Sequence, residues 1–333
     1  MGAMKRSMML KALKPNDCFT LFMMSFGFCL SLAGCDAHQA SQSPSTLVSP
    51  NQSNDIKVVT PDWGVAATMA AMGKPPIATG DIRVWEQWVG EPQLPNSVVD
   101  LGLRYQPNAE LVAQLEPDLL IDNFFYEHAR GVYGDVKNVS IIVSGTENNK
   151  ADASVRTWQD FITPTLELGD TIGEPEHAKA YISESKQEIV QKGEVFRAHQ
   201  PNIKRFAVAQ FVDGNNFRMY AKNSLFNPAM NLMGLELIEL GEGNGWGFTG
   251  QQVGDLANLD ADVCLLIIEP LNAISEAELK NSLVWQRVGY GQTGDAGRCM
   301  AKLPPVWIYG GMASLTRVAD MMATADYVGG GAV

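Results

Sequence analysis

The residues that could act as catalytic acids, bases or nucleophiles are few and lie far apart in the chain. Of the four histidines, His128 is the one that falls in a segment patterned as a compact lobe, because His38 lies in a polar stretch and His177 and His199 lie on one long helical pattern. The sequence contains no GxSxG motif and indicates no Ser-His-Asp or Cys-His arrangement. We therefore predict that the chain is not an enzyme and that its residues form no metal centre.

Aromatic side chains, in contrast, gather in loops that follow predicted strands. A single aromatic residue at a strand end is most often a lid on the core, but several of them flanked by Gly and Pro suit the walls of a cleft. Ligand sites in α/β layers also tend to lie beyond the carboxyl ends of strands. The residues concerned are Trp85, Trp88, Phe124, Phe125, Tyr126, Trp246, Trp307 and Tyr309.

Arg104 lies where a strand-like run turns into a helix, within the segment VDLGLRYQPN at residues 99–108. An arginine at such a point is normally an exposed surface residue. A guanidinium in a cleft would instead supply a fork of hydrogen-bond donors for negatively charged oxygens of a ligand. The motif that surrounds Arg104 favours the second interpretation.

Short apolar runs that alternate with amphipathic stretches must position these loops. Such alternation is typical of α/β layers with largely parallel sheets. The predicted strands span residues 55–60, 118–121, 139–143, 205–211, 236–240 and 262–268, and the predicted helices span residues 64–72, 108–115, 224–233 and 312–322.

The chain is predicted to fold as two lobes. A helix–turn–strand pattern occurs once in each half, at residues 110–121 and 255–267, and the longest helical pattern, from about Glu174 to His199, lies between them. We therefore expect an α/β fold of two lobes with central, largely parallel sheets, joined by one long rigid helix. The predicted boundaries are 55–172 for the N-terminal lobe, 173–200 for the interlobe helix and 201–333 for the C-terminal lobe.

Composition limits the partners of the protein. The 333 residues are 46% hydrophobic and carry a formal net charge of −12. Binding to a nucleic acid usually requires a cationic face, so we exclude that partner. Cys264 and Cys299 are the cysteines that remain in the body of the protein, and in an exported protein they could form a disulfide or stay as two buried thiols.

The first 34 residues are predicted to be a targeting segment. A basic front with Lys5 and Arg6 precedes an uncharged run from Cys18 to Gly34, and Cys35 follows directly. This order resembles the bacterial lipoprotein signal, in which the cysteine is lipidated and becomes the N-terminus. The alternative is a short transmembrane anchor, for which the run is marginal in length. Residues 35–54 are rich in Ser, Gln, Asn and Pro, and we expect them to form a flexible tether.

Several motifs together resemble one known family. They are VWEQWVGEP at residues 84–92, LPNSVVDLGLRYQPNAELVAQLEPDLLI at residues 94–121, Asn223-Ser224-Leu225-Phe226, Trp246-Gly247, and VWIYGG at residues 306–311. In this order the chain is similar to the periplasmic binding proteins of iron(III)-hydroxamate (ferrichrome-type) ABC importers. The likeness runs from about residue 55 to residue 330.

The resemblance implies an aromatic cleft between two lobes that captures an iron(III)-hydroxamate siderophore. The iron complex is the ligand, no cofactor is needed, and no bond is made or broken. In this family an arginine and a tyrosine of the N-terminal lobe hydrogen-bond the hydroxamate oxygens, and Arg104 and Tyr126 occupy the matching positions. The residues that match the aromatic wall are Trp88, Trp246, Trp307 and Tyr309.

The resemblance also implies a monomer that delivers its ligand to an inner-membrane ABC permease. The lipid anchor would hold it on the periplasmic face of the bacterial inner membrane. Family members dock on the permease through an acidic residue on each lobe, and Glu127 and Asp255 are the candidates here. Most of the 37 acidic residues, however, simply keep the surface solvated.

Two alternatives stay open. The same architecture could bind haem, cobalamin or a catecholate siderophore. A catecholate complex would call for several basic residues in the cleft, whereas Arg104 is the one that the motifs place there, and haem would call for an axial histidine or tyrosine. An exported α/β enzyme is the alternative of another class, and turnover of a substrate panel would distinguish it.

We predict that replacing Cys35 with Ala blocks maturation, because the thiol is the atom that is lipidated. The measurement is metabolic labelling of the protein with a fatty acid, which the Cys35→Ala variant should lose. Unchanged labelling of the variant would contradict the lipoprotein assignment.

Overall fold

The computed structural model describes residues 56–144, 155–292 and 297–330. The predicted targeting segment, Cys35 and the tether lie outside the described residues. Within that part of the chain, no helix is long and apolar enough to cross a membrane.

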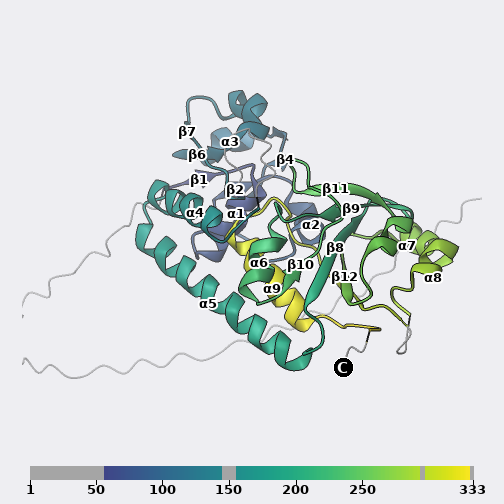
Figure 1. The fold of residues 1–333 in the computed structure, drawn as a ribbon. Helices are drawn as coiled ribbons and strands as arrows, with labels where there is room; N and C mark the ends of the chain where they lie inside the picture. The colour runs from purple at the N-terminus through teal and green to yellow at the C-terminus, as the bar shows by residue number, and fades with distance from the viewer. Residues whose placement is uncertain (1–55, 145–154, 293–296, 331–333) are drawn as a thin grey trace, which may run out of the picture. The chain divides into compact units, whose positions relative to one another are not determined.

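Five parallel strands form the sheet of the N-terminal lobe (Figure 1). On the strand β6 (Leu119–Asp122), Leu119 and Ile121 join one cluster of buried residues, and Leu120 joins the cluster on the opposite face. Both faces of the sheet are therefore covered, as expected for parallel strands that read as continuous apolar runs. The strand order is β3 (Val99–Asp100), β2 (Ala78–Thr79), β1 (Val58–Val59), β6 and β7 (Lys137–Ser140).

Short helices and one hairpin surround this sheet. The hairpin pairs β4 (Gly102–Leu103) with β5 (Gln106–Pro107), so that residues 104 and 105 form its two-residue turn. The helices are α1 (Trp63–Ala71), η1 (Ile82–Val84), α2 (Trp85–Trp88), α3 (Ala109–Leu115) and the 3-10 segment η2 (Phe124–Tyr133).

The C-terminal lobe contains a mixed sheet of six strands. Its parallel strands β8 and β12 carry the core, and antiparallel β9 and β11 extend it on one side. The strands are β8 (Arg205–Phe211), β9 (Asn216–Tyr220), β10 (Glu236–Leu237), β11 (Phe248–Gln252), β12 (Val263–Ile268) and β13 (Met300–Leu303). The helices of this lobe are α6 (Phe226–Leu232), η3 (Val253–Asn258), α7 (Ala273–Asn281) and α8 (Leu283–Val288).

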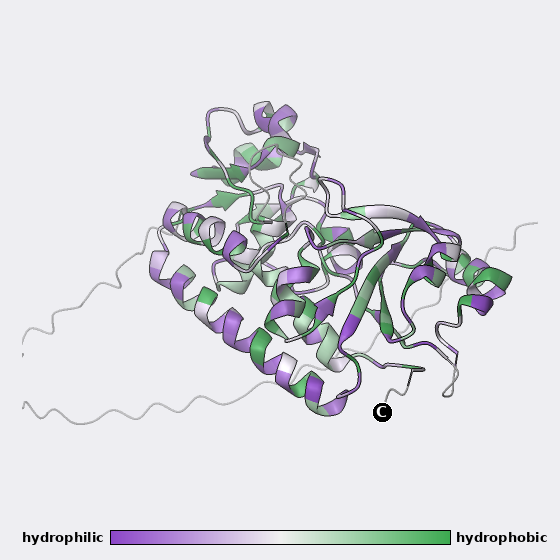
Figure 2. Ribbon diagram, in the orientation of Figure 1, coloured by the Kyte–Doolittle hydropathy of each residue, from purple (hydrophilic) through white to green (hydrophobic). Residues whose placement is uncertain are grey.

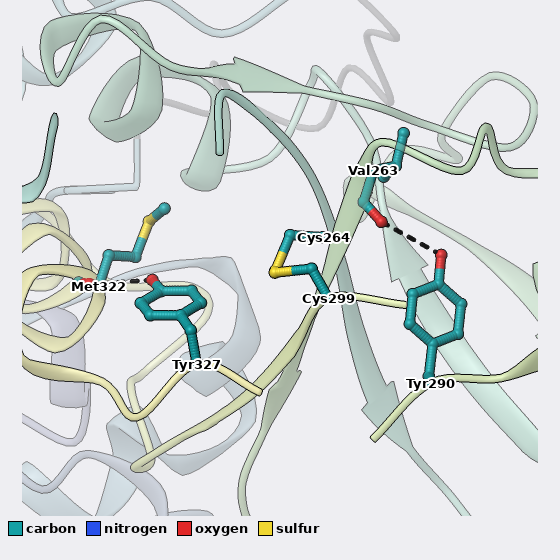
Figure 3. The surroundings of a disulfide bond; sticks show 6 residues. All are labelled: Val263, Cys264, Tyr290, Cys299, Met322 and Tyr327. Carbon is teal, nitrogen blue, oxygen red and sulfur yellow. Dashed lines mark hydrogen bonds between the residues drawn. A yellow bond between two sulfur atoms is a disulfide. The ribbon is translucent and has the colours of Figure 1, made fainter. Parts of the chain in front are cut away.

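A disulfide links Cys264 on β12 to Cys299, directly before β13 (Figure 3). The two cysteines belong to the main cluster of buried apolar residues, and neither is exposed. The bond therefore joins two neighbouring strands inside the core. The sequence left open whether the two cysteines form a disulfide or stay as buried thiols, and the structure contains the disulfide.

Helix α5 (Pro175–His199) occupies the span where the long helix is predicted, and it packs against α4 (Gln159–Thr171), α6 and α9 (Met312–Thr324). Figure 2 shows hydrophilic and hydrophobic residues alternating along α5. This pattern is typical of a helix that packs its apolar face against neighbouring helices. At Gly193 the helix comes so close to α6 that an added Cβ would lie 2.5 Å from the Cα atom of Met233.

Helix α4 contributes to the cores of both lobes. Its Phe161 lies in the cluster built on β8 and β12, whereas its Leu168 lies in the cluster built on β1 and β6. Helix α9 behaves similarly, because Ala313 packs with Trp63 while the rest of the helix packs with the C-terminal core. Three packed helices thus run between the lobes, and the boundaries at residues 172 and 200 stay a prediction.

The two-lobe α/β class is confirmed, and the differences lie at the edges. Strands β3 and β4 fall in the strand-like run noted before Arg104, whereas β2, β5, β9, β11 and β13 were not predicted, and neither were α2, α4, α7 and α8. Strands of two residues, such as β2, are too short to show a period, and the edge strand β11 carries polar residues.

We predict that the Cys264→Ala/Cys299→Ala double variant loses about 3–4 kcal/mol of unfolding free energy. The cysteines are 35 residues apart, and a cross-link of that span removes chain entropy from the unfolded state. Chemical denaturation of both proteins, followed by circular dichroism, measures the difference. If Cys264 and Cys299 of the denatured wild-type protein are alkylated without prior reduction, they are free thiols, and the prediction is contradicted.

Candidate functional site

The carboxyl ends of the N-terminal strands bring the candidate site together. The loops after β1, β2, β3, β6 and β7 all leave the sheet at the same edge, because the strands are parallel. These loops supply Asp62 and Trp63 after β1, Asp81 after β2, Arg104 after β3, Asn123 to Tyr126 after β6, and Ile142 to Ser144 after β7.

Arg104 lies on the turn of the β4–β5 hairpin, and Asp81 holds it there. The backbone N–H of Arg104 donates to Oδ2 of Asp81 at 3.1 Å, and the guanidinium Nε lies 3.5 Å from the same oxygen. The loop of Asp81 must approach closely, because a Cβ at Gly80 would lie 2.9 Å from the Cα atom of Arg104. The side chain of Arg104 is only 11% exposed, so it is not an ordinary surface arginine.

Aromatic rings surround the guanidinium of Arg104. Its Cζ lies 3.5 Å from the ring centroid of Trp63 and 5.1 Å from that of Trp307, a cation–π arrangement with two indoles. The Nε1–H of Trp63 donates to the carbonyl of Gly80 at 2.8 Å, which fixes the ring. Because Trp63 comes from the N-terminal lobe and Trp307 from the segment before α9, the cation sits between elements of both halves.

Tyr126 lies beside this cation. Nη1 of Arg104 donates to its hydroxyl oxygen at 3.3 Å, and the ring stacks on Tyr105 with centroids 5.3 Å apart. Burial raises the pKa of Tyr126 far above its ordinary value, and the negative charge of Asp62 adds to the rise. The phenol is therefore neutral over the whole physiological range.

Asp62 is a buried carboxylate at the start of α1. Its Oδ1 accepts the backbone N–H of Val65 at 2.9 Å as the helix N-cap, and its Oδ2 accepts Nδ2 of Asn123 at 2.7 Å. Burial raises the pKa of Asp62, although these hydrogen bonds and the charge of Arg104 act in the opposite direction. Asn123 in turn accepts the N–H of Phe125 at 3.1 Å and so shapes the loop that carries Tyr126.

A chain of ring contacts crosses from one lobe to the other. Phe125 lies 5.4 Å from Trp246, Trp246 lies 5.8 Å from Tyr309, and Tyr309 lies 5.7 Å from Trp307, measured between centroids. Trp246 is nonetheless 47% exposed, which a core residue would not be. Such exposed rings provide apolar area at little cost in conformational entropy.

A cavity of about 430 Å³ lies against these rings, between the two lobes. Its lining is mostly apolar with a few polar groups, the usual composition of a small-molecule site. The lining residues are Asp62, Asn123, Phe124, Phe125, Ile142, Val143, Ser144, Arg156, Asn223, Ser224, Leu225, Asn244, Gly245, Trp246, Ile308 and Tyr309.

Of the predicted ligand-binding residues, Tyr126 and Trp307 contact the guanidinium of Arg104, and Trp246 and Tyr309 line the cavity. Trp88 is different: it ends α2, is 38% exposed and makes no ring contact with the others within the described residues. Its role in the wall stays a prediction, and Trp85 is the residue of that motif that contacts Trp63.

The other predicted positions lie outside the cavity. Glu127 is exposed on η2, with its Oε1 3.6 Å from Nη1 of Arg130. Asp255 closes a capping box at the start of η3, where its Oδ2 accepts the N–H of Gln252 at 2.8 Å. His128 stacks on Tyr105, and across residues 56–144, 155–292 and 297–330 no group of three His, Cys, Asp or Glu side chains could hold a metal ion.

The sequence reasoning missed Asp62, Trp63, Asn123 and Arg156. The first three could have been found from one signal, because Asp62-Trp63 and Asn123 follow predicted buried strands as directly as Tyr126 does. Arg156 carries no comparable signal, since it follows no strand and belongs to none of the motifs.

Comparison with known proteins places this geometry in a family. Residues 58–294 match the family model described as periplasmic binding protein. The chain is 25% identical over 297 residues to the iron(3+)-hydroxamate-binding protein FhuD of Escherichia coli, an alignment that covers 88% of this chain and 92% of that protein.

Two solved structures share the fold. The siderophore-binding protein FhuD of Vibrio cholerae, solved with Fe3+-Desferal, superposes with a TM-score of 0.69 at 22% identity, covering 81% of this chain and 97% of that one. A periplasmic heme-binding protein of Pseudomonas aeruginosa superposes with a TM-score of 0.54 at 18% identity, covering 82% and 94%. Both kinds of ligand are thus bound by proteins with this architecture.

Proposed function

Because the chain belongs to the periplasmic binding protein family, we propose that it captures an iron(III)-hydroxamate siderophore between its lobes and delivers it to an ABC importer. Family membership supports a role in binding rather than in catalysis. The 25% identity to an iron(3+)-hydroxamate-binding protein along nearly the whole of both chains supports the ligand class.

The observation that carries this proposal is the pairing of Arg104 with Tyr126. Hydroxamate oxygens fill the coordination positions of the iron and keep partial negative charge, so the protein needs hydrogen-bond donors rather than metal ligands. Arg104 donates to the oxygen of the Tyr126 hydroxyl, which leaves the phenol hydrogen of Tyr126 free to point elsewhere. Both residues can therefore donate to the same anionic group.

The aromatic surroundings suit the organic shell of such a complex. The rings of Trp63 and Trp307 contact the cation, and those of Trp246 and Tyr309 lead from it to the cavity. A siderophore backbone is broad and partly apolar, so rigid rings gain contact area with little loss of rotamer freedom.

Haem is the second candidate, because a heme-binding protein shares the fold. An axial tyrosine would have to bind iron as a phenolate, whereas burial raises the pKa of Tyr126 and opposes its ionisation. His128 is the histidine of this region, and its Nε2 lies 3.2 Å from the carbonyl oxygen of Tyr105. These contacts favour the hydroxamate complex.

The proposed site of action is the periplasmic face of the inner membrane. Cys35 would carry the lipid anchor, and the labelling experiment on Cys35→Ala tests it. We also propose that the protein acts as a monomer with one cleft, for which a stoichiometry of one iron complex per chain in the titration below is expected.

We predict that ferric hydroxamates quench the tryptophan emission saturably and that Arg104→Lys weakens binding roughly 10- to 100-fold. Lysine keeps the charge but loses the planar fork and its stack on Trp63, and a charge-assisted hydrogen bond contributes about 1.5–3 kcal/mol. The measurement is a fluorescence titration with ferrichrome, ferrioxamine B and ferric aerobactin.

Arg83→Lys is the matched control. Arg83 pairs with the same Asp81 at 3.2 Å, but its side chain is 65% exposed and contacts none of the cleft rings in the described structure. The affinity of the Arg83→Lys variant for the ferric hydroxamates should stay within about twofold of wild type. Equal affinities of the two variants would contradict the role of Arg104, and binding of haem with no response to any hydroxamate would replace the proposed ligand.

We also propose that Glu127 and Asp255 dock on arginines of the permease, one from each lobe. Docking charges act mainly on encounter and partner choice, so neutralising them should leave siderophore affinity unchanged and strongly reduce uptake. The variant is Glu127→Gln/Asp255→Asn, since Asn can still accept the capping hydrogen bond from Gln252. Growth of cells on the siderophore as sole iron source is the measurement.

The matched control neutralises Glu110 on α3 and Glu278 on α7, two exposed acids of the same two lobes. This Glu110→Gln/Glu278→Gln variant should support normal growth. If the Glu127→Gln/Asp255→Asn variant grows equally well, the two residues are not the docking pair.

A further inference from the structure

Arg156 is a buried arginine in the lining of the cavity. It lies just before α4, where the chain passes from one lobe to the other. Its backbone N–H donates to the carbonyl of Lys222 at 2.9 Å, and its carbonyl accepts Nδ2 of Asn227 at 2.8 Å. The backbone is thus fixed on the C-terminal lobe, and the guanidinium is the part of Arg156 that is left to bind a ligand.

The guanidinium of Arg156 is unusual in its surroundings. The residue is only 6% exposed, yet its side chain makes no hydrogen bond or ion pair with any other residue that the structure describes. Arg104, the other cleft arginine of low exposure, pairs with Asp81. A cation of low exposure without a compensating partner is costly, and a charged group of this kind in a cleft is a candidate for ligand binding.

The rest of the lining does not neutralise this charge. Asp62 is the single acidic residue among the described lining residues, and its two oxygens already accept hydrogen bonds from Val65 and Asn123. Burial moreover raises the pKa of Asp62. The other polar residues of the lining are uncharged amides and hydroxyls, so the cavity offers one strong site for an anion.

The cavity lies next to the site around Arg104. Asp62, Trp246 and Tyr309 line it. Asp62 interacts electrostatically with Arg104, and Tyr309 contacts Trp307, which in turn contacts the Arg104 guanidinium. One ligand can therefore place its iron centre at Arg104 and extend a side arm into the cavity.

Building on the proposed function, we infer that Arg156 binds a carboxylate on the siderophore, so that the preferred ligands are ferric hydroxamates that carry a free carboxylate group. A planar guanidinium binds a carboxylate through two parallel hydrogen bonds, which a neutral or cationic arm cannot form. Two arginines thus select the ligand: Arg104 binds the iron-bound oxygens, and Arg156 binds the carboxylate on the side arm of the siderophore.

The experiment uses three ferric complexes that differ only at one end: ferrioxamine B with its free amine, its N-acetyl derivative and its N-succinyl derivative. They carry a positive, a neutral and a negative end group, respectively. Tryptophan quenching gives the affinity of each for wild type, Arg156→Gln and Arg156→Lys. Arg287→Gln on α8 is the matched control, because it removes the same charge from an exposed position outside the cavity lining.

Wild type and Arg287→Gln should bind the N-succinyl complex at least roughly tenfold more tightly than the N-acetyl complex. Arg156→Gln should bind the N-acetyl complex as wild type does but lose most of that preference, and Arg156→Lys should keep part of it. A preference that survives in Arg156→Gln, or equal binding of the N-acetyl and N-succinyl complexes by wild type, overturns the inference while leaving the proposed function intact. Binding of none of the three complexes overturns the inference, and it overturns the proposed function as well if ferrichrome and ferric aerobactin also fail to bind.

Discussion

The stacking of the Arg104 guanidinium on Trp63 is the interaction on which the rest of the site depends. A cation that is 11% exposed requires compensation, and it receives this from the ring at 3.5 Å, from Asp81 and from the hydroxyl oxygen of Tyr126. Each partner comes from a different strand end. The register of four neighbouring strands is therefore constrained by one side chain, because a slip of any of them would remove a partner from the buried charge.

The second constraint is the way in which the lobes are joined. Helix α4 contributes side chains to the cores of both lobes, and α5 packs along both α4 and α9. Moving one lobe against the other would open these cores, whereas a connection through extended strands would leave them intact. The cleft is thus assembled before the ligand arrives, which lowers the ordering cost of binding and suits a protein whose rings are already in contact across the cleft.

The sequence was sufficient where a local pattern determines the structure. The strands β6, β8 and β12 and the helix α5 could be predicted, because burial on both faces of a strand leaves a continuous apolar run and burial of one helical face leaves a helical period. Arg104 was predicted because it lies within a motif of a known family, and Tyr126 because its loop corresponds to the loop that carries the family's tyrosine. The meeting of Arg104 with Trp63, more than forty positions earlier, depends on strand order, which no local pattern contains.

Trp88 and Arg156 show two ways in which the sequence fails to predict a site residue. A residue within a motif can lie away from the cluster, and a residue without a motif can line the cavity. Trp88 lies in a motif rich in tryptophan, yet it is 38% exposed at the end of α2, whereas Trp85 is buried and reaches the cluster. Arg156 lies between a β-strand and a helix in a segment without pattern. Its place in the cavity follows from two backbone hydrogen bonds to the other lobe.

The net negative charge of the protein repels an anionic ligand, whereas the arginines of the cleft attract it. The distance over which each of these interactions acts decides which one the ligand experiences. Removal of residues 1–34 takes away four basic residues and one acid, which changes the net charge from −12 to −15. An anionic complex that approaches the protein is therefore repelled, but salt screens this repulsion beyond about 8 Å at physiological ionic strength. The side chain of Arg104 is 11% exposed and Arg156 is 6% exposed, and charges that are shielded from water interact far more strongly with a nearby partner. The protein can therefore be acidic overall and still select an anion, provided that its cations are buried and directed at the ligand.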